Sequence, residues 1–271
     1  MRVPLLLLAA AASLLSACST SPTGRQQLML ISPEAAIVES KKAYLSTVRE
    51  LDANSKLVSD PAVVKRVQTV TGRLVTEAIK LYPSTKDWEW SVAIIDDPDT
   101  INAWCMAGGR MAIYTGIINK LKLTDDEMAQ IMGHEISHAV ANHSAEKMSR
   151  AMAINVGVAA TAAASDNNAL VLSGAAMAAK LALDLPNSRT AESEADRIGI
   201  EIAALAGYDP QAAVSLWQKM AEVGGNGPPQ FLSTHPAPAN RQKALSSLGP
   251  EMRELMPASG KASVYPIEIV Q

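Results

Sequence analysis

Three of the four histidines in this 271-residue chain lie within twelve residues, "MGHEISHAVANH", at positions 132–143. The stretch contains "HEISH", which matches H-E-x-x-H, and composition alone gives about 0.006 expected matches with a carboxylate at the second position. On a helix His134 and His138 are one turn apart, so both imidazoles face one side and can bind a single Zn²⁺. Chance is a poor explanation, and the pattern predicts a zinc site.

Glu135 is the predicted catalytic base, because it follows the first histidine and points towards the side of the metal. Zinc lowers the pKa of a bound water to about 7, where a neighbouring carboxylate can take its proton. We therefore expect Glu135 to activate water for attack on a carbonyl and to pass the proton on to the leaving amine.

A catalytic zinc needs a third protein ligand and keeps one position open. In "ESEAD", Glu192 and Asp196 are four residues apart and share one helix face, and Gly199 continues that stripe. A glycine there allows close approach of the helix that carries the histidines. We predict that Glu192 is the third ligand and that Asp196 accepts the free ring N–H of His134. Glu194 points elsewhere and receives no role.

His143 is a less suitable ligand, since it lies five residues after His138 and too far along the same helix to complete a tetrahedron. The related pattern H-E-x-x-H-x-x-G-x-x-H fails as well, because Ala141 and Ser144 occupy its glycine and third-histidine positions. We interpret His143 as a polar residue near the helix end.

The elements that must position these residues are mostly helical. Thr124 and Glu127 form a capping box that starts the histidine helix. Alternation of apolar and polar residues over 88–94 predicts a strand, and Gly108-Gly109 predicts a turn between strands Ala103–Met106 and Arg110–Tyr114. The expected fold class is α+β, predominantly helical, with an antiparallel sheet of about three strands.

Residues 151–185 are rich in alanine and nearly without charge. Each uncharged run is shorter than the roughly 20 residues that span a bilayer. We predict a helical hairpin beside the active site; a surface that enters lipid, or a lid over the cleft, is the alternative. Residues 249–271 are predicted to form a loosely ordered tail, which leaves 32–248 as one domain.

The N-terminal segment 1–17 has the short apolar run of a secretory signal, and "LSAC" resembles a bacterial lipobox that ends at Cys18. We expect Cys18 to be lipidated and residues 18–31 to form a polar tether. Ser19 favours the outer membrane, so the predicted location is the periplasmic face of that membrane in a bacterial envelope. An ordinary signal that leaves Cys18 unmodified is the alternative.

Charge and cysteine content restrict the partners. The net charge is −3 and the pI is near 5.8, without a basic cluster that would bind nucleic acid. With Cys18 acylated, Cys105 has no disulfide partner, and we interpret it as a small buried apolar residue rather than a catalytic thiol.

Several segments resemble the gluzincin metallopeptidases of the CAAX-prenyl-protease/HtpX family, in particular lipoprotein peptidases of the LoiP and BepA type and the mitochondrial Oma-type protease. The similarity covers about residues 22–248 and includes the stretches "TGRQQLMLIS", "INAWCMAGGRMAIYTG", "HEISH", "SRTAESEAD" and "THPAPANR". The resemblance implies a gluzincin fold and supports Glu192 as third ligand.

The same resemblance implies roles for two further residues. His235 would approach the metal from a loop, to stabilise the oxyanion or to occupy the open coordination position. Arg241 is the arginine that follows His-Pro and would lie behind the ligands. The strand segment along the cleft would contain Asn102, Ala103, Gly108 and Gly109. Ala107 departs from the family, which often has proline there.

Together these features predict a zinc endopeptidase with one zinc per chain, which acts on protein or peptide substrates of the envelope. The substrate backbone would lie extended against the strand 103–106 or 110–114, and protein quality control is the role that the family suggests. The alternative is an outer-membrane assembly chaperone with a latent or regulatory zinc. A purely structural zinc, with His235 as a permanent fourth ligand, is a third possibility.

Overall fold

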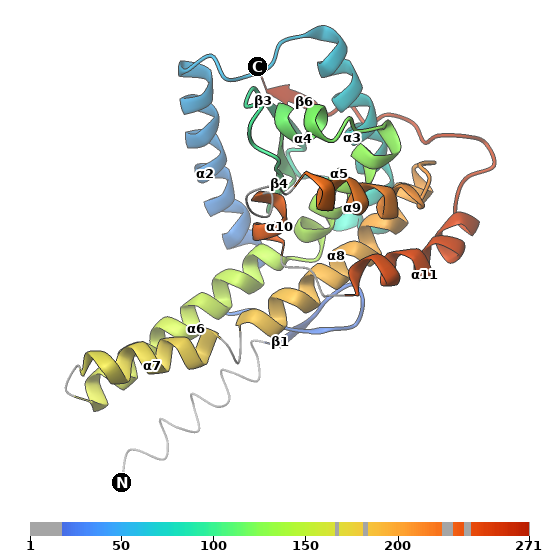
Figure 1. Cartoon of the computed structure of the whole chain (residues 1–271). Helices are drawn as coiled ribbons and strands as arrows, with labels where there is room; N and C mark the ends of the chain where they lie inside the picture. The colour runs from blue at the N-terminus through green and yellow to red at the C-terminus, as the bar shows by residue number, and fades with distance from the viewer. Residues whose placement is uncertain (1–17, 166–167, 181–183, 224–229, 236–239, 271) are drawn as a thin grey trace.

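The computed structural model describes residues 18–165, 168–180, 184–223, 230–235 and 240–270 (Figure 1). The predicted signal segment 1–17 lies outside the described residues. Helices dominate the described chain: α2 (Pro33–Ala53), α3 (Pro61–Leu81), α4 (Thr115–Lys120), α5 (Asp125–Val140), α6 (His143–Ala164), α7 (Ala169–Ala179), α8 (Leu185–Leu205), α9 (Ala212–Glu222), α10 (Gln230–Thr234) and α11 (Arg241–Glu254), with a short 3₁₀ helix at Pro83–Thr85.

The helix that carries the H-E-x-x-H motif starts where the sequence predicts. The Thr124 side chain accepts from the backbone of Glu127, and the Glu127 carboxylate accepts from the backbone of Thr124, so the capping box is complete. Helices α2 and α3 begin in a similar way, with Ser32 and Asp60 as their N-caps. These caps satisfy backbone N–H groups that the first turn leaves without partners.

The sheet contains β3 (Ser91–Ile95), β4 (Ala103–Met106), β5 (Arg110–Tyr114) and β6 (Glu268–Val270) in the order β4-β5-β3-β6. The predominantly helical α+β class is confirmed, as is the antiparallel pair β4–β5. However, β3 pairs with β5 in parallel, because the chain reverses after β3 and again at Gly108-Gly109, which brings β5 between β3 and β4.

The expectation of a loosely ordered C-terminal tail is wrong. Helix α11 continues to Glu254, and β6 adds a parallel strand to β3. Between them, the N–H of Tyr265 donates to the carbonyl of Gly72 at 3.1 Å. A Cβ at Gly72 would lie 2.6 Å from the Tyr265 carbonyl oxygen, so the segment packs directly on the backbone of α3.

Helix α5 lies in the centre of the fold, between α8, α3, α9 and strand β4 (Figure 1). Its crossing with α8 is very close. A Cβ at Gly133 would lie 2.8 Å from the Gly199 carbonyl oxygen, and a Cβ at Gly199 would lie 2.7 Å from the backbone nitrogen of His134. The close approach predicted from Gly199 is therefore present, and glycines on both helices make it possible.

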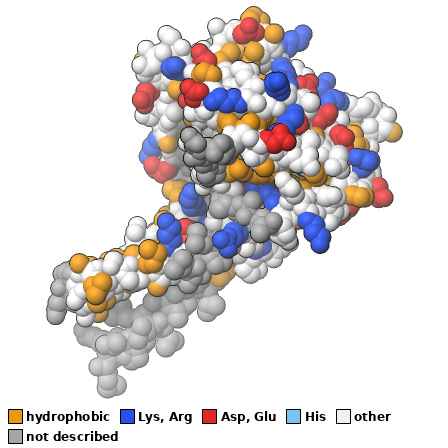
Figure 2. All heavy atoms as spheres, in the orientation of Figure 1, with side chains coloured by type: hydrophobic (Ala, Val, Ile, Leu, Met, Phe, Trp, Pro, Cys, Tyr) orange, Lys and Arg blue, Asp and Glu red, His pale blue; other side chains and the backbone are white. Residues whose placement is uncertain are grey.

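The alanine-rich segment forms α6 and α7, which lie side by side and project from the body of the protein (Figure 1). None of the described residues of α7 is buried. Hydrophobic side chains gather on the visible face of this pair (Figure 2), and the exposed ones are Met152, Val156, Leu170, Val171 and Met177. Among the described helices, none is long and apolar enough to span a bilayer.

The segment expected to be a polar tether is a folded hairpin of β1 (Cys18–Thr20) and β2 (Gln26–Leu28). Cys18 is exposed at its start. The expectation fails because polar residues of this segment are partners of buried charged groups elsewhere: Gln27 is buried, and Arg25 binds carboxylates of α6 and α8. Met29 and Ile31 then pack against Ala36 and Ala145.

Candidate metal centre

Four side chains from distant parts of the chain converge beside the α5–α8 crossing. His134 and His138 come from α5, Glu192 comes from α8 and His235 directly follows α10. One donor atom from each lies within 4.8 Å of the others. The structure thus brings the three predicted ligands together and adds His235 as a fourth donor.

The spacing of these donors fits a tetrahedral metal. The Nε2 atoms of His134 and His138 are 3.1 Å apart, and the Glu192 oxygens lie 3.3 Å and 3.4 Å from them. A tetrahedral zinc with bonds of roughly 2.0–2.1 Å has ligands about 3.3 Å apart. The residues present therefore match the dimensions of a zinc site.

Hydrogen bonding at the other ring nitrogens supports the same conclusion. Nδ1 of His134 lies 3.1 Å from Oδ1 of Asp196, and Nδ1 of His138 lies 2.8 Å from Nδ1 of His143. We assign the ring proton to Nδ1 in both ligands, which leaves a lone pair on each Nε2. Two lone pairs that face each other at 3.1 Å cannot hydrogen-bond, whereas a cation satisfies both.

The ionisation of these groups reflects burial and mutual charge. Without a metal, His134 can be protonated at both ring nitrogens. Burial alone would then raise the pKa of Glu192, but hydrogen bonds from His134 and His235 outweigh it and hold that pKa far below its usual range. Burial would lower the pKa of His134, yet Asp196 and Glu192 raise it to about 9. The pKa of His138 falls well below its usual value because of burial and of the neighbouring charge on His134.

Glu135 is buried beside the donors and faces the cleft. Burial raises the pKa of its carboxyl above the usual value. The cleft has a volume of about 220 Å³ and is lined by Glu135, His138 and His235, by Trp104 and Cys105 of β4, and by residues from the starts of α6 and α8. Burial also raises the pKa of the Cys105 thiol well above its usual value, which argues against a catalytic thiolate.

His235 lies where it would supply a fourth donor to a metal held by His134, His138 and Glu192. Its Nδ1 lies 3.3 Å from Nε2 of His134 and 3.2 Å from both oxygens of Glu192, and its Nε2 lies 3.3 Å from Oε1 of Glu135. Phe231 stacks on the imidazole with ring centroids 4.5 Å apart. Of the two roles that the sequence left open, this arrangement matches occupation of the fourth coordination position.

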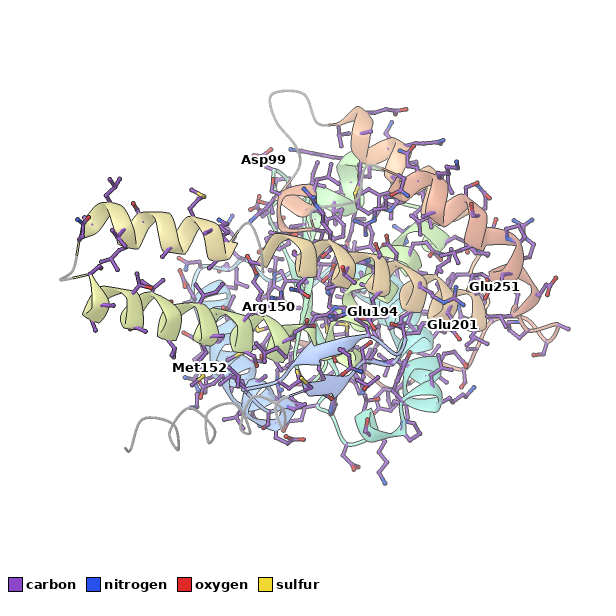
Figure 3. All side chains as sticks on the ribbon, turned by 90° about the horizontal axis from the view of Figure 1, so that it is seen from below. Asp99, Arg150, Met152, Glu194, Glu201 and Glu251 are labelled. Carbon is purple, nitrogen blue, oxygen red and sulfur yellow. The ribbon has the colours of Figure 1, made fainter. Side chains whose placement is uncertain are left out.

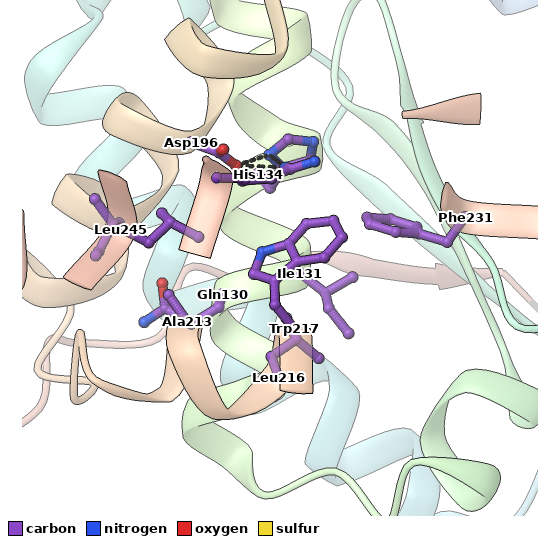
Figure 4. Close-up of a pocket in the computed structure, with 11 residues that line it drawn as sticks. Gln130, Ile131, His134, Asp196, Ala213, Leu216, Trp217, Phe231 and Leu245 are labelled. Atoms are coloured by element: carbon purple, nitrogen blue, oxygen red, sulfur yellow. Dashed lines mark hydrogen bonds and ion pairs between the residues drawn. The ribbon is translucent and has the colours of Figure 1, made fainter. Parts of the chain in front are cut away.

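Asp196 and Arg241 support His134 from behind. Figure 4 shows Asp196 against the His134 ring, with Trp217 and Leu245 nearby. Nη2 of Arg241 donates to Oδ1 of Asp196 at 2.5 Å, and its guanidinium lies 3.7 Å from the centre of the Trp217 ring. Nη1 of Arg241 is 3.6 Å from Glu192. This arginine therefore fixes the carboxylate that orients a ligand.

The assumption that His143 lies on the same helix as His138 is wrong, although His143 does lie close to the end of that helix. Helix α5 ends at Val140, and Asn142 adopts the left-handed conformation with φ 56°, so α6 starts at His143 and turns this side chain back to His138. Glu194, which received no role, is buried and lies 3.1 Å from Nε2 of His143. Asparagine tolerates positive φ, so Asn142 was the signal for a break in the helix.

The predicted substrate strand is present only in part. Among the described strands, β5 is paired on both sides, so β4, which begins at Ala103, is the edge beside the cleft. Asn102 is buried just before it and accepts from the Ala103 N–H. Gly108 and Gly109 instead form the turn, with Cβ positions that would meet Ile37 and Trp90.

Two histidines one turn apart, a glutamate from a second helix and a buried carboxylate beside them match the residue pattern of a metallopeptidase active site. Sequence comparison agrees: the model of peptidase family M48 matches residues 61–248. The chain belongs to this family.

Named relatives support this assignment. The chain is 34% identical over 241 residues to the mitochondrial metalloendopeptidase OMA1 of Bos taurus, with 84% of this chain and 45% of the relative covered. It is 36% identical over 163 residues to mitochondrial metalloendopeptidase OMA1 of Arabidopsis thaliana, with 58% and 31% covered. The beta-barrel assembly-enhancing protease of Escherichia coli K12 matches at 26% over 223 residues, with 79% and 44% covered. The chain spans less than half the length of these relatives.

These comparisons overturn the predicted location on the periplasmic face of a bacterial outer membrane. Relatives from animals, plants and yeasts, at 32–36% identity, carry mitochondrial names, while the bacterial proteases match at 26–29%. The location rested on a four-residue pattern and on Ser19, which hold far less information than similarity along most of the chain.

Proposed function

We propose that the protein is a zinc-dependent endopeptidase that holds one zinc through His134, His138 and Glu192. The observation that carries the proposal is the set of donor separations of 3.1–3.4 Å, which match a tetrahedral site. Nitrogen and carboxylate donors in this geometry favour zinc over magnesium or calcium, which prefer six or more oxygens.

Zinc in this position would lower the pKa of a water and polarise the scissile carbonyl. Glu135 takes the proton of the attacking water at its carboxylate and returns it to the leaving amine. Its burial supports this exchange, because the raised pKa brings the carboxyl closer to that of an activated water. The Nδ1 protons of His134 and His138 stay in hydrogen bonds to Asp196 and His143. Neither ring therefore competes with Glu135 for the proton of the attacking water.

An extended protein segment is the substrate that the fold accommodates. The edge of β4 offers backbone groups to an added strand, and Trp104 and Cys105 line the cleft next to Glu135. Strand addition needs an extended segment whose backbone groups are unpaired, and unfolded proteins offer many such segments. We therefore propose unfolded proteins as substrates and protein quality control as the role.

His235 adds a condition to this function. If zinc is held by His134, His138 and Glu192, Nδ1 of His235 would be a fourth donor to it, and His235 would have to move to admit a substrate carbonyl. A structural zinc would instead keep all four protein ligands permanently, and a chaperone would not need cleavage at all.

Replacement of Glu135 by Gln tests the proposal. We expect loss of peptidase activity on an unfolded protein while zinc content, measured by elemental analysis, stays at one per chain. Retained cleavage would contradict the assignment of Glu135. A chaperone activity that survives in Glu135→Gln would favour the alternative function.

Lipidation of Cys18 is a separate proposal, supported by the "LSAC" pattern and by the exposure of Cys18 at the start of β1. We expect Cys18→Ser to move the protein from the membrane fraction to the soluble fraction. An unchanged distribution would exclude a lipid at this residue as the anchor.

A further inference from the structure

We propose that the N-terminal hairpin β1–β2 is a positioning element for the metal ligand His138, and that it acts through Arg25, Glu194 and His143. These residues do not touch the reacting atoms. The inference rests on the proposed zinc site and extends it to the hairpin Cys18–Leu28, which lies far before the start of α5 at Asp125.

The first link is the hydrogen bond between the two imidazoles. A metal at Nε2 of His138 requires the ring proton at Nδ1, which then donates to Nδ1 of His143 over 2.8 Å. Nδ1 of His143 must accept, so its own proton is on Nε2 and donates to Oε2 of Glu194 over 3.1 Å. Each proton in this chain therefore has one position.

The second link joins Glu194 to the hairpin. Oε1 of Glu194 accepts from the Thr23 hydroxyl at 2.6 Å, and Oε2 accepts from Nε of Arg25 at 2.9 Å. The Glu194 side chain is only 3% exposed, so these donors replace solvent around it. Figure 3 shows Glu194 on α8, close to the N-terminal strands. The hairpin thereby fixes the carboxylate that orients His143.

The third link joins the same hairpin to the start of α6. The two Nη atoms of Arg25 donate to the two oxygens of Glu146 at 2.8 Å and 2.7 Å, and Gln27 donates to Glu146 at 2.9 Å and to the carbonyl of Ala141 at 2.8 Å. Ala141 lies at the break between α5 and α6. The hairpin thus holds the turn that brings His143 back to His138.

Arg25 is the centre of this arrangement, because its guanidinium contacts carboxylates from two helices. Without it Glu146 and Glu194 would remain buried, and Glu194 would lose its only cation among the described contacts. A bidentate arginine also fixes direction, which a lysine cannot do. The carboxylate of Glu194 would then no longer hold one orientation of His143.

The test measures zinc affinity of the full chain, by competition with a chromogenic chelator, for wild type, Arg25→Ala and the control Arg253→Ala. Arg253 forms an exposed ion pair with Asp209 and does not line the cleft, so its removal provides a matched loss of charge. Loss of a partner behind a metal ligand typically lowers metal affinity about 10–100-fold. We expect the zinc affinity to be about tenfold lower for Arg25→Ala and unchanged for Arg253→Ala.

A second readout separates positioning from general stability. His143→Asn keeps an acceptor for the His138 N–H but no longer reaches Glu194. In that background Arg25→Ala should not weaken zinc binding further, since the link is already broken. Thermal unfolding of the metal-free variants records any loss of fold independently. If Arg25→Ala does not fold, Thr23→Val replaces it, with an expected decrease of a few fold in zinc affinity.

The outcomes are distinct. Zinc affinity equal to that of the Arg253→Ala control, or additive effects of the Arg25 and His143 substitutions, would overturn the inference while the zinc site stands. Absence of zinc binding in wild type would overturn the proposed function itself. The positioning role would be supported if Arg25→Ala weakens zinc binding in the wild-type background but causes no further weakening when His143→Asn is already present.

Discussion

The two histidines of H-E-x-x-H are neighbours on one helix, yet they are oriented by opposite ends of the chain. His134 donates directly to Asp196, which Arg241 of α11 holds. His138 donates to a second imidazole, His143, behind which lie Glu194 and the N-terminal hairpin. One ligand therefore has a carboxylate as its immediate partner, and the other has a neutral ring.

The difference shows how one turn of helix combines two kinds of support. A carboxylate makes a stronger, charge-assisted hydrogen bond than a neutral imidazole and raises the basicity of its ligand more. The set of residues that orients His134 is also smaller: it consists of Asp196 on α8 and Arg241 on α11. We therefore expect zinc binding to depend more on Asp196 than on the hairpin.

Removal of a ligand should have the largest effect and should not distinguish the two sides. We expect His134→Ala and His138→Ala each to lose most of the bound zinc, because only one histidine of α5 and Glu192 then remain beside His235, which is not a permanent ligand in the proposed mechanism. Elemental analysis after dialysis measures this loss. Full zinc occupancy in either variant would contradict the ligand assignment.

Removal of Asp196 should reveal the difference between the two sides. Asp196→Ala is expected to lower zinc affinity about 100-fold, at the upper end of the usual range for such partners, compared with about tenfold for Arg25→Ala. Competition with a chelator measures both under the same conditions. Equal losses would show that a direct carboxylate and a linked imidazole hold their ligands equally well.

Removal of His235 asks whether the two supported histidines and Glu192 hold zinc without a fourth protein ligand. We expect His235→Ala to retain one zinc and to cleave an unfolded protein several-fold faster, because the coordination position becomes open to substrate. Zinc content and kcat/KM are the measurements. A decrease in kcat/KM with zinc retained would assign His235 to oxyanion stabilisation instead.

The smallest effect concerns the helix that both histidines share. Hydrogen bonds from Lys219, Thr124 and Ser215 outweigh the burial of Glu127 and lower its pKa in the folded protein. A lowered folded pKa stabilises the fold above the unfolded value of about 4.3, and this contribution disappears as the pH falls through the folded pKa. Glu127→Gln should therefore cost about 1 kcal/mol of unfolding free energy at pH 7.

Denaturant unfolding of the metal-free protein between pH 7 and pH 3 measures this contribution. The difference between wild type and Glu127→Gln should be constant above about pH 5 and should narrow below about pH 4. Since α5 carries both ligands, the ratio of the Asp196→Ala and Arg25→Ala effects should stay the same in this background. If the difference in unfolding free energy between wild type and Glu127→Gln grew towards low pH, the lowered pKa of Glu127 would be contradicted.

The ligands and the residue that orients His134 could be predicted from the sequence, because their positions follow helical spacing. His134, His138 and Glu192 each lie at a motif position, and Gly199 indicated the close crossing before any coordinates. Asp196 followed from its position one turn after Glu192. Helical periodicity shows which side chains share one face of a helix. Gly199 indicated which two helices approach each other closely.

The other side was not accessible, because it depends on a chain reversal and on contacts over long sequence distances. A spacing rule assumes one continuous helix, and Asn142 breaks it between His138 and His143. Arg25 and Glu194 are 169 residues apart, and neither belongs to a periodic pattern that would pair them. Likewise β6 is three residues long, too short for alternation to show.

The contact of Gly133 with Gly199 has a practical meaning for protein engineering. It sets the distance between the two backbones that carry the ligands, so this distance does not depend on the ligand side chains themselves. Exchanging histidine for cysteine or aspartate would change the chemistry of the donors but not the room between them. Adapting this scaffold to an ion of different size must therefore begin with the helix crossing.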